Sequence, residues 1–228
     1  MSLKLVIWDM DGTLVDSREV IQTAMVRAFE DLDLTPPAYE ETRKIVGLGL
    51  AEACRLLTPN GFDQSRLPEL VEAYKNAFMA RRMEKSFKEP LYDGTLETLE
   101  RLANEGWLQA LATGKSHRGI RAIFEMHPIG DYFDTIWCAD DGPGKPHPFM
   151  VNEAMGALGA EAHQSIMIGD AIHDIRMAKS ANVRALGVSW GFGLGEELLD
   201  AGADELHHDF ESLNVSIDQF GEAVLAGA

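Results

Sequence analysis

The chain has 228 residues, of which 46% are hydrophobic, and its 20 basic and 37 acidic side chains give a formal net charge of −17. This charge argues against binding to nucleic acid or to anionic membrane surfaces, whose phosphates would be repelled. The two cysteines, Cys54 and Cys138, are far apart, which favours a reducing compartment over a disulfide or zinc site. No segment approaches the roughly 18 consecutive apolar residues of a membrane span. We therefore expect a cytoplasmic protein of undetermined oligomeric state.

Short apolar runs recur along the chain and predict buried parallel strands. The first is Leu3–Trp8, and the later ones are Trp107–Ala112, Thr135–Cys138, Ser165–Ile168 and Arg184–Val188. Each is separated from the next by enough residues for a helix. This alternation predicts a doubly wound, Rossmann-like α/β fold with a parallel sheet.

The segment 17–90 interrupts this alternation with helical periodicity and no convincing strand. Leu67, Leu70, Tyr74 and Phe78, for example, recur at the spacing of one helix face. We therefore predict an α/β core made of residues 1–16 and 91–228, with an all-helical domain inserted at 17–90.

Pairs of carboxylates follow two of the predicted strands. Asp9 and Asp11 come directly after the first strand, and Asp170 and Asp174 follow the run that ends at Ile168. The carboxyl ends of parallel strands form the ligand-binding edge of open α/β sheets, so the two pairs could share one cation. Magnesium prefers such hard oxygen ligands. Alternatively, Asp170 caps the next helix and Asp174 adds charge that suits its dipole.

Two further polar groups complete the predicted site. Thr113-Gly114 follows another strand and Lys145 lies in a proline-rich loop. A hydroxyl, backbone N–H groups and an ammonium are what phosphoryl transfer requires, because they hold phosphoryl oxygens and balance their charge. Taken singly, Thr113 could only cap a helix starting near Ser116, and Lys145 could be a solvated loop residue.

Together these motifs resemble the four signature motifs of haloacid dehalogenase superfamily phosphatases. The resemblance covers nearly the whole chain. Within the superfamily, the helical insertion is similar to the cap of the phosphoglycolate phosphatase and β-phosphoglucomutase branch. The residues that carry the resemblance, in chain order, are Asp9-Met10-Asp11-Gly12-Thr13, Thr113, Lys145-Pro146 and Gly169-Asp170 with Asp174.

The resemblance implies a role for each of these residues. Asp9 would attack the phosphoryl group to form an aspartyl-phosphate, while Asp11 would act as general acid and base. Mg²⁺ would be held by Asp9, the backbone carbonyl of Asp11 and Asp170, and Asp174 would orient Lys145 or a metal-bound water. The implied substrate-binding residues are Gly12, Thr113, Gly114, Lys145, Arg43 and Lys44.

The assignments of Arg43, Lys44 and Gly114 to substrate binding leave alternatives open. Arg43 and Lys44 lie where relatives close a cap loop over the substrate, so either could meet a second anionic group, or both could form a solvated helix end. Gly114 stands where many relatives have Asn, so this position keeps its backbone N–H but has no side chain to contact the substrate beyond the phosphate.

The predicted activity is magnesium-dependent hydrolysis of a small phosphorylated metabolite, such as phosphoglycolate or a sugar phosphate. A hexose-phosphate mutase is the first alternative, because such mutases resemble this sequence closely. The histidine-containing cap stretch that would support it is missing, since none of the seven histidines precedes His117. A dehalogenase is disfavoured because Asp11 is present. A catalytically silent binding protein is the remaining alternative, although Asp9, Asp11, Lys145 and Asp170 are all intact.

Overall fold

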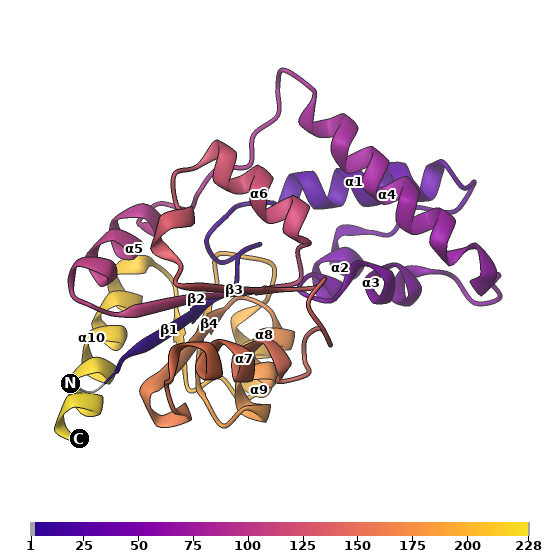
Figure 1. The fold of residues 1–228 in the computed structure, drawn as a ribbon. Helices are drawn as coiled ribbons and strands as arrows, with labels where there is room; N and C mark the ends of the chain where they lie inside the picture. The colour runs from indigo at the N-terminus through magenta and orange to yellow at the C-terminus, as the bar shows by residue number, and fades with distance from the viewer. Residues whose placement is uncertain (1–2, 228) are drawn as a thin grey trace.

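The computed structural model describes residues 3–227, and its centre is one parallel β-sheet (Figure 1). The strand order is β3-β2-β1-β4-β5-β6, with every neighbouring pair parallel. This confirms the predicted α/β class, and it adds β6, which is too short to give a sequence signal. The strands are β1 (Leu5–Trp8), β2 (Leu108–Thr113), β3 (Thr135–Cys138), β4 (Ser165–Gly169), β5 (Arg184–Val188) and β6 (Glu205–His207).

Helices cover both faces of the sheet because successive side chains of a strand point to opposite faces. Val6 and Trp8 belong to one buried apolar cluster, and Leu5 and Ile7 belong to another. The first cluster includes side chains of α5 (Thr95–Asn104), α6 (His117–Met126) and α10 (Phe210–Ala226). The second includes side chains of α7 (Phe149–Leu158), α8 (Ile172–Ser180) and α9 (Gly195–Asp200).

A helical insertion lies between β1 and β2, as predicted, and Figure 1 shows it beside the carboxyl edge of the sheet. Its two long helices, α1 and α4, pack against each other, and a third apolar cluster fills the space between the helices. The insertion helices are α1 (Arg18–Glu30), α2 (Tyr39–Thr42), α3 (Leu50–Leu57) and α4 (Leu67–Arg82). The insertion also contains the 3₁₀ turns η1 (Arg43–Ile45) and η2 (Gln64–Arg66). The 3₁₀ turns η3 (Gly130–Tyr132) and η4 (Ala162–Gln164) belong to the α/β core.

The two connections between sheet and insertion run side by side. The backbone N–H of Asp16 donates to the Pro90 carbonyl at 2.8 Å, and that of Tyr92 donates to the Leu14 carbonyl at 3.0 Å. The insertion is thus attached through two hydrogen-bonded segments that form an isolated antiparallel bridge between Val15 and Leu91. Among residues 3–227, no helix combines the length and the hydrophobicity that crossing a membrane requires.

A buried hydrogen-bond chain ties the centre of the sheet to α5. Trp8 Nε1 donates to Gln109 Oε1 at 3.1 Å, and Gln109 Nε2 donates to the Leu99 carbonyl at 2.9 Å. All three residues are fully buried. Gln109 therefore satisfies an indole N–H that water cannot reach.

We expect Gln109→Leu to destabilise the fold by about 1–3 kcal/mol, because the Trp8 indole N–H would lose its acceptor in a dry core. Urea unfolding followed by far-ultraviolet circular dichroism measures this change. Gln219→Leu is the matched control, since that side chain is exposed on α10. Equal unfolding midpoints for the two variants would contradict the assigned role of Gln109.

Candidate active site

The chemistry-bearing residues of the motifs meet at the carboxyl edge of the sheet. Asp9 follows β1, Thr113 ends β2, and Asp170 follows β4. Because β1 lies between β2 and β4, the three residues emerge side by side. All three are buried, with Asp9 only 2% exposed. The parallel topology therefore brings together side chains that are up to 161 positions apart in the numbering of the chain.

Lys145 connects two of the carboxylates. Its Nζ donates a short hydrogen bond to Asp9 Oδ1 and lies 2.6 Å from Asp174 Oδ1. Burial lowers the pKa of the Lys145 ammonium, but Asp174 and Asp9 raise it more, and the net result is a pKa well above the usual value. Lys145 therefore stays charged, and the solvated-loop alternative for this residue is excluded.

One ammonium does not neutralise the carboxylates around it. Burial raises the pKa of Asp9 from 3.8 to about 7, against the opposing effect of Lys145. Burial also raises the pKa of Asp170 well above its usual range, and the charges of Asp9 and Asp174 add to this effect. The site carries an excess of buried negative charge that a cation would relieve.

The arrangement of these carboxylates fits a divalent metal ion. One oxygen from each of Asp9, Asp170 and Asp174 lies within 4.8 Å of the others. Asp170 is oriented by the Thr13 hydroxyl at 2.9 Å and by the Phe192 backbone N–H at 2.7 Å. Three hard, fixed oxygen ligands are the donor set that Mg²⁺ prefers.

Asp174 takes part in this cluster through its side chain and also caps its own helix. Its Oδ2 accepts from the Ala171 backbone N–H at 3.0 Å, while its Oδ1 faces Lys145. The predicted capping alternative is thus partly correct, but Asp174 rather than Asp170 supplies the capping oxygen.

Glycine at position 12 makes room for Asp170. A Cβ atom on Gly12 would lie 2.2 Å from Asp170 Oδ2, and the backbone there has φ of +92°. No other residue fits both constraints. Gly12 therefore allows the strand that carries Asp9 and the strand that carries Asp170 to deliver their carboxylates to one point.

Asp11 contacts a second, largely buried ammonium, that of Lys115. Lys115 Nζ lies 2.9 Å from Asp11 Oδ1 and 3.5 Å from Glu89 Oε1. Burial lowers the pKa of Lys115, but Asp11 and Glu89 raise it more, so the net shift is upward. Arg82 Nη2 completes the network at 3.1 Å from Glu89 Oε2.

Sequence reasoning missed Lys115. The only available signal was its position two residues after Thr113, at the same strand end. Its contact with Glu89 could not be found this way, because Glu89 belongs to the segment that leaves the insertion.

Thr113 does not cap the helix that follows it, and Gly114 is in contact with the insertion. The N-terminus of α6 is capped by Ser116, whose Oγ accepts from the Gly119 N–H at 3.3 Å, so the capping alternative for Thr113 is excluded. A Cβ atom on Gly114 would lie 2.6 Å from the Gly47 carbonyl oxygen. The backbone of the insertion therefore rests directly on Gly114, which explains why this position has no side chain.

Arg43 and Lys44 do not lie beside Asp9 but between the insertion and the core. The Arg43 guanidinium forms a bidentate ion pair with Glu197 at 2.8 and 3.0 Å and contacts Glu40 at 2.6 Å. The Lys44 carbonyl accepts from His173 Nε2 at 2.9 Å. Both residues line a separate hollow of about 360 Å³ between the insertion and α8–α9. The structure thus places them in the contact between insertion and core, not beside Asp9.

The cavity that contains Asp9 has a volume of about 720 Å³. Asp11, Thr113, Gly114 and Lys115 line its floor, and residues of α1, α3 and α4 line the opposite wall. The site therefore lies between the sheet and the helical insertion.

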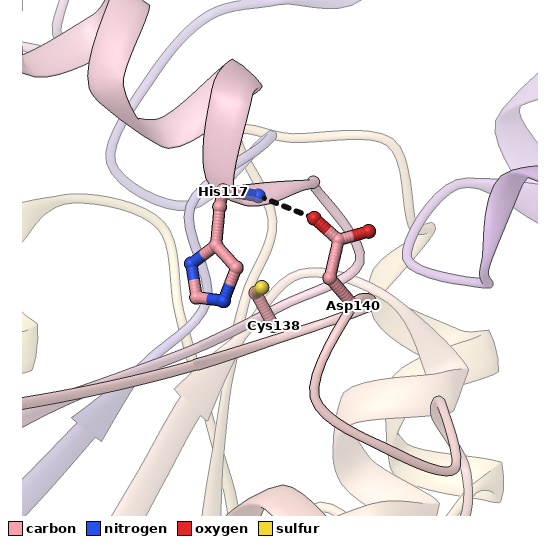
Figure 2. A group of neighbouring side chains, drawn as sticks. All are labelled: His117, Cys138 and Asp140. Carbon is pink, nitrogen blue, oxygen red and sulfur yellow. Dashed lines mark hydrogen bonds between the residues drawn. The ribbon is translucent and has the colours of Figure 1, made fainter.

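Figure 2 shows a second group of potential metal ligands, His117, Cys138 and Asp140, near this cavity. The Asp140 carboxylate is turned toward the backbone N–H of His117 and accepts from it at 2.9 Å. His117 Nε2 contacts Asp141 at 2.8 Å, and burial raises the pKa of the Cys138 thiol to about 12. These groups already have partners at the start of α6, so we assign no metal to them.

The raised pKa of Asp9 predicts a pH-dependent instability of the metal-free protein. Asp9 binds its proton more tightly when folded, so stability is lost as the pH rises from 3.8 toward 7. Each pKa unit corresponds to about 1.4 kcal/mol. In chelator, we expect Asp9→Asn to melt several degrees above the wild type at pH 8, with a gap that narrows as the pH falls to 4.

Differential scanning calorimetry measures this gap, with Asp131→Asn, an exposed residue of η3, as control. Mg²⁺ at pH 8 should raise the melting temperature of the wild type and of the control more than that of Asp9→Asn. If Asp9→Asn and the wild type differed in melting temperature by the same amount at every pH, ionisation of buried Asp9 would not be the cause of the difference.

Comparison with known proteins agrees with this geometry. Residues 6–188 match the family model described as haloacid dehalogenase-like hydrolase. The chain is 33% identical over 221 residues to a protein named probable phosphatase IndB of Dickeya dadantii, covering 96% of this chain and 91% of that protein. It is 31% identical over 199 residues to a phosphoglycolate phosphatase of Pseudomonas fluorescens, covering 86% and 73% of the two chains.

A solved structure, described as a predicted phosphatase from Clostridium acetobutylicum, superposes with a TM-score of 0.84 at 28% sequence identity. The match covers 96% of this chain and all of that one. The family match and the relatives together show that the chain belongs to the haloacid dehalogenase-like hydrolase family.

Proposed function

We propose that this chain is a Mg²⁺-dependent phosphatase that hydrolyses a small phosphate monoester through a phosphoryl group carried by Asp9. The single observation that supports this most is the buried triad of Asp9, Lys145 and Asp174. It holds a carboxylate nucleophile at the floor of a cavity, beside a permanent positive charge and within reach of further carboxylates. The names of the relatives make phosphoglycolate the first compound to test.

In the first step, a carboxylate oxygen of Asp9 attacks phosphorus and the bond to the ester oxygen breaks. Asp11, which lines the same cavity, donates its proton to the leaving oxygen. The Lys145 ammonium offsets the repulsion between the Asp9 carboxylate and the incoming phosphate. The Thr113 hydroxyl and the Gly114 N–H, at the same strand end, would receive the phosphoryl oxygens.

In the second step, Asp11 accepts a proton from water, whose oxygen attacks the phosphorus of the aspartyl-phosphate. The bond between phosphorus and the Asp9 oxygen breaks, so phosphate leaves and the carboxylate is restored. Lys115 keeps the Asp11 side chain at the cavity in both steps, in the first as the acid and in the second as the carboxylate. Mg²⁺ held by Asp9, Asp170 and the Asp11 carbonyl, with Asp174 beside them, would supply further positive charge to the transferring group.

We further propose that residues 17–90 form a cap that moves on the core of residues 1–16 and 91–228. The paired connections at Asp16 and Pro90 support a hinge there. Arg43 with Glu197 and His173 with Lys44 would then hold the cap in the position seen in the structure. In this proposal Arg43 and Lys44 act in cap docking and not in substrate binding.

Replacement of the nucleophile tests the proposed reaction. We expect Asp9→Asn to abolish Mg²⁺-dependent phosphate release, and Asp11→Asn to lower kcat by about 10²–10⁴-fold because proton transfer is lost. Phosphate release from a panel of small phosphomonoesters measures both effects, and mass spectrometry of acid-quenched enzyme should find a phosphoryl group on Asp9.

Asp131→Asn should retain full activity. Conversion of a hexose phosphate into its isomer without phosphate release would instead favour the mutase. Absence of turnover and of a phosphorylated enzyme with every compound would favour a silent binding protein.

The contact between Gly114 and the cap predicts a second effect. The methyl group of Gly114→Ala would collide with the backbone carbonyl of Gly47, so the cap loop must shift. We expect kcat/KM to fall roughly 10–100-fold, because a shift of about 1 Å in a positioning element has this cost. Gly156→Ala is the control, since a Cβ atom at that position of α7 meets open space. Equal kcat/KM values for the two variants would show that the cap loop does not need this contact.

A further inference from the structure

The cap side of the active-site cavity is an apolar wall. It is built by one face of α1, the turn before α3, the first residues of α3 and the middle of α4. Several of these side chains also belong to the apolar cluster of the cap, so their positions are fixed by packing. The apolar lining residues are Ile21, Met25, Ile45, Val46, Leu48, Leu50, Val71, Tyr74, Phe78 and Met79.

The cavity is large for a two-carbon leaving group. Its volume of about 720 Å³ lies within the range of sites that enclose compounds of drug size, and such sites are mostly apolar with a few fixed polar groups. The polar lining residues of the core surround Asp9 and Asp11, while the cap side is mostly apolar with Glu52, Lys75 and Arg82 among its residues. The floor thus suits a phosphate, and the wall suits an apolar body attached to it.

Cations inside the cavity are already paired with carboxylates. Lys115 contacts Asp11 and Glu89, and Arg82 contacts Glu89, whose side chain is fully buried. Lys75 pairs with Glu72 at 2.6 Å. A second anionic group on the substrate would have to compete with these carboxylates.

Arg118 is the exception among the described lining residues, since it has no carboxylate partner. It is exposed, and its guanidinium contacts Met79 Sδ at 2.6 Å. Its position provides the competing hypothesis, in which Arg118 receives a carboxylate such as that of phosphoglycolate.

Tyr74 supplies a neutral polar group within the wall. Its ring lies 5.9 Å from that of Phe78, which makes a broad aromatic surface. Burial and the nearby Asp11 carboxylate raise the pKa of the Tyr74 phenol well above its usual value, so the hydroxyl stays protonated. The Arg82 guanidinium and the Lys115 ammonium lie 4.9 and 5.5 Å from the Phe78 ring centroid, and both are paired with carboxylates. A planar or branched apolar group would pack on this surface beside cations whose charge is already balanced.

We infer that the substrate is a phosphate monoester whose leaving group is an uncharged, apolar alcohol, aromatic or branched and larger than glycolate, that packs on the cap wall. This inference rests on the proposed function, because the phosphate must lie at Asp9. It narrows the class of substrates. The wall offers an apolar group a surface to pack on, whereas a second anion would meet cations that are mostly paired with carboxylates. Cap closure over such a group removes its surface from water, which is the source of the affinity.

A series of n-alkyl phosphates from methyl to hexyl, below their micellar concentrations, tests the inference directly. We expect kcat/KM to rise about fourfold per methylene, equivalent to about 0.8 kcal/mol, until the wall is filled. Phenyl and naphthyl phosphate should also exceed phosphoglycolate.

Val71→Asp on α4 should flatten the dependence on chain length, because the new carboxylate lies on the apolar wall. Val71→Thr is the milder substitution, to be used if circular dichroism shows that the first variant does not fold. Val215→Asp on α10, at a side chain that is 54% exposed, is the matched control and should keep the slope of the wild type.

A flat alkyl series would overturn the inference while leaving the phosphatase reaction intact. A preference for phosphoglycolate that is lost in Arg118→Ala would likewise overturn it in favour of an anionic leaving group. Failure of the proposed function itself has a different result, namely no phosphate release and no phosphorylated Asp9 with any compound in the series.

Discussion

The structure depends on the placement of one buried ammonium among several buried carboxylates. Lys145 contacts Asp9 and Asp174, and Asp170 completes a group whose negative charge exceeds its positive charge. Such a group is costly to bury and persists only where the rest of the fold fixes every member. The buried central strands, the Gly12 turn and the two hydrogen bonds to Asp170 do this, so the sheet stabilises a site that is unfavourable by itself.

The same excess of buried negative charge favours the binding of a cation. A divalent cation and a phosphate together bring both signs of charge, so the site reaches balance only when it is loaded. Asp11 is separated from the metal-binding carboxylates by its contact with Lys115, which gives two carboxylates two residues apart different surroundings.

The helical insertion contributes shape more than charge. Its ion pair of Arg43 with Glu197 of the core lies outside the active-site cavity. At the cavity the insertion contributes the Gly47 backbone, a mostly apolar wall and Arg82, whose charge is paired with Glu89. In the proposed function, the core would provide the phosphate chemistry and the insertion the surface that meets the rest of the substrate. Family membership by itself therefore does not identify the substrate.

The sequence determined the α/β class and five of the six strands, because buried strands are continuous apolar runs. It also singled out Asp9, Asp170 and Asp174, which follow two of these strands, and Lys145, which completes the resemblance to the family motifs. Only the tertiary structure decided the pairing of Lys115 with Asp11 and Glu89, the contact that requires Gly114, and the docking role of Arg43. Each of these joins the insertion or its connections to the sheet. Local patterns do not encode how two separately packed units meet, since that depends on side chains far apart in the chain.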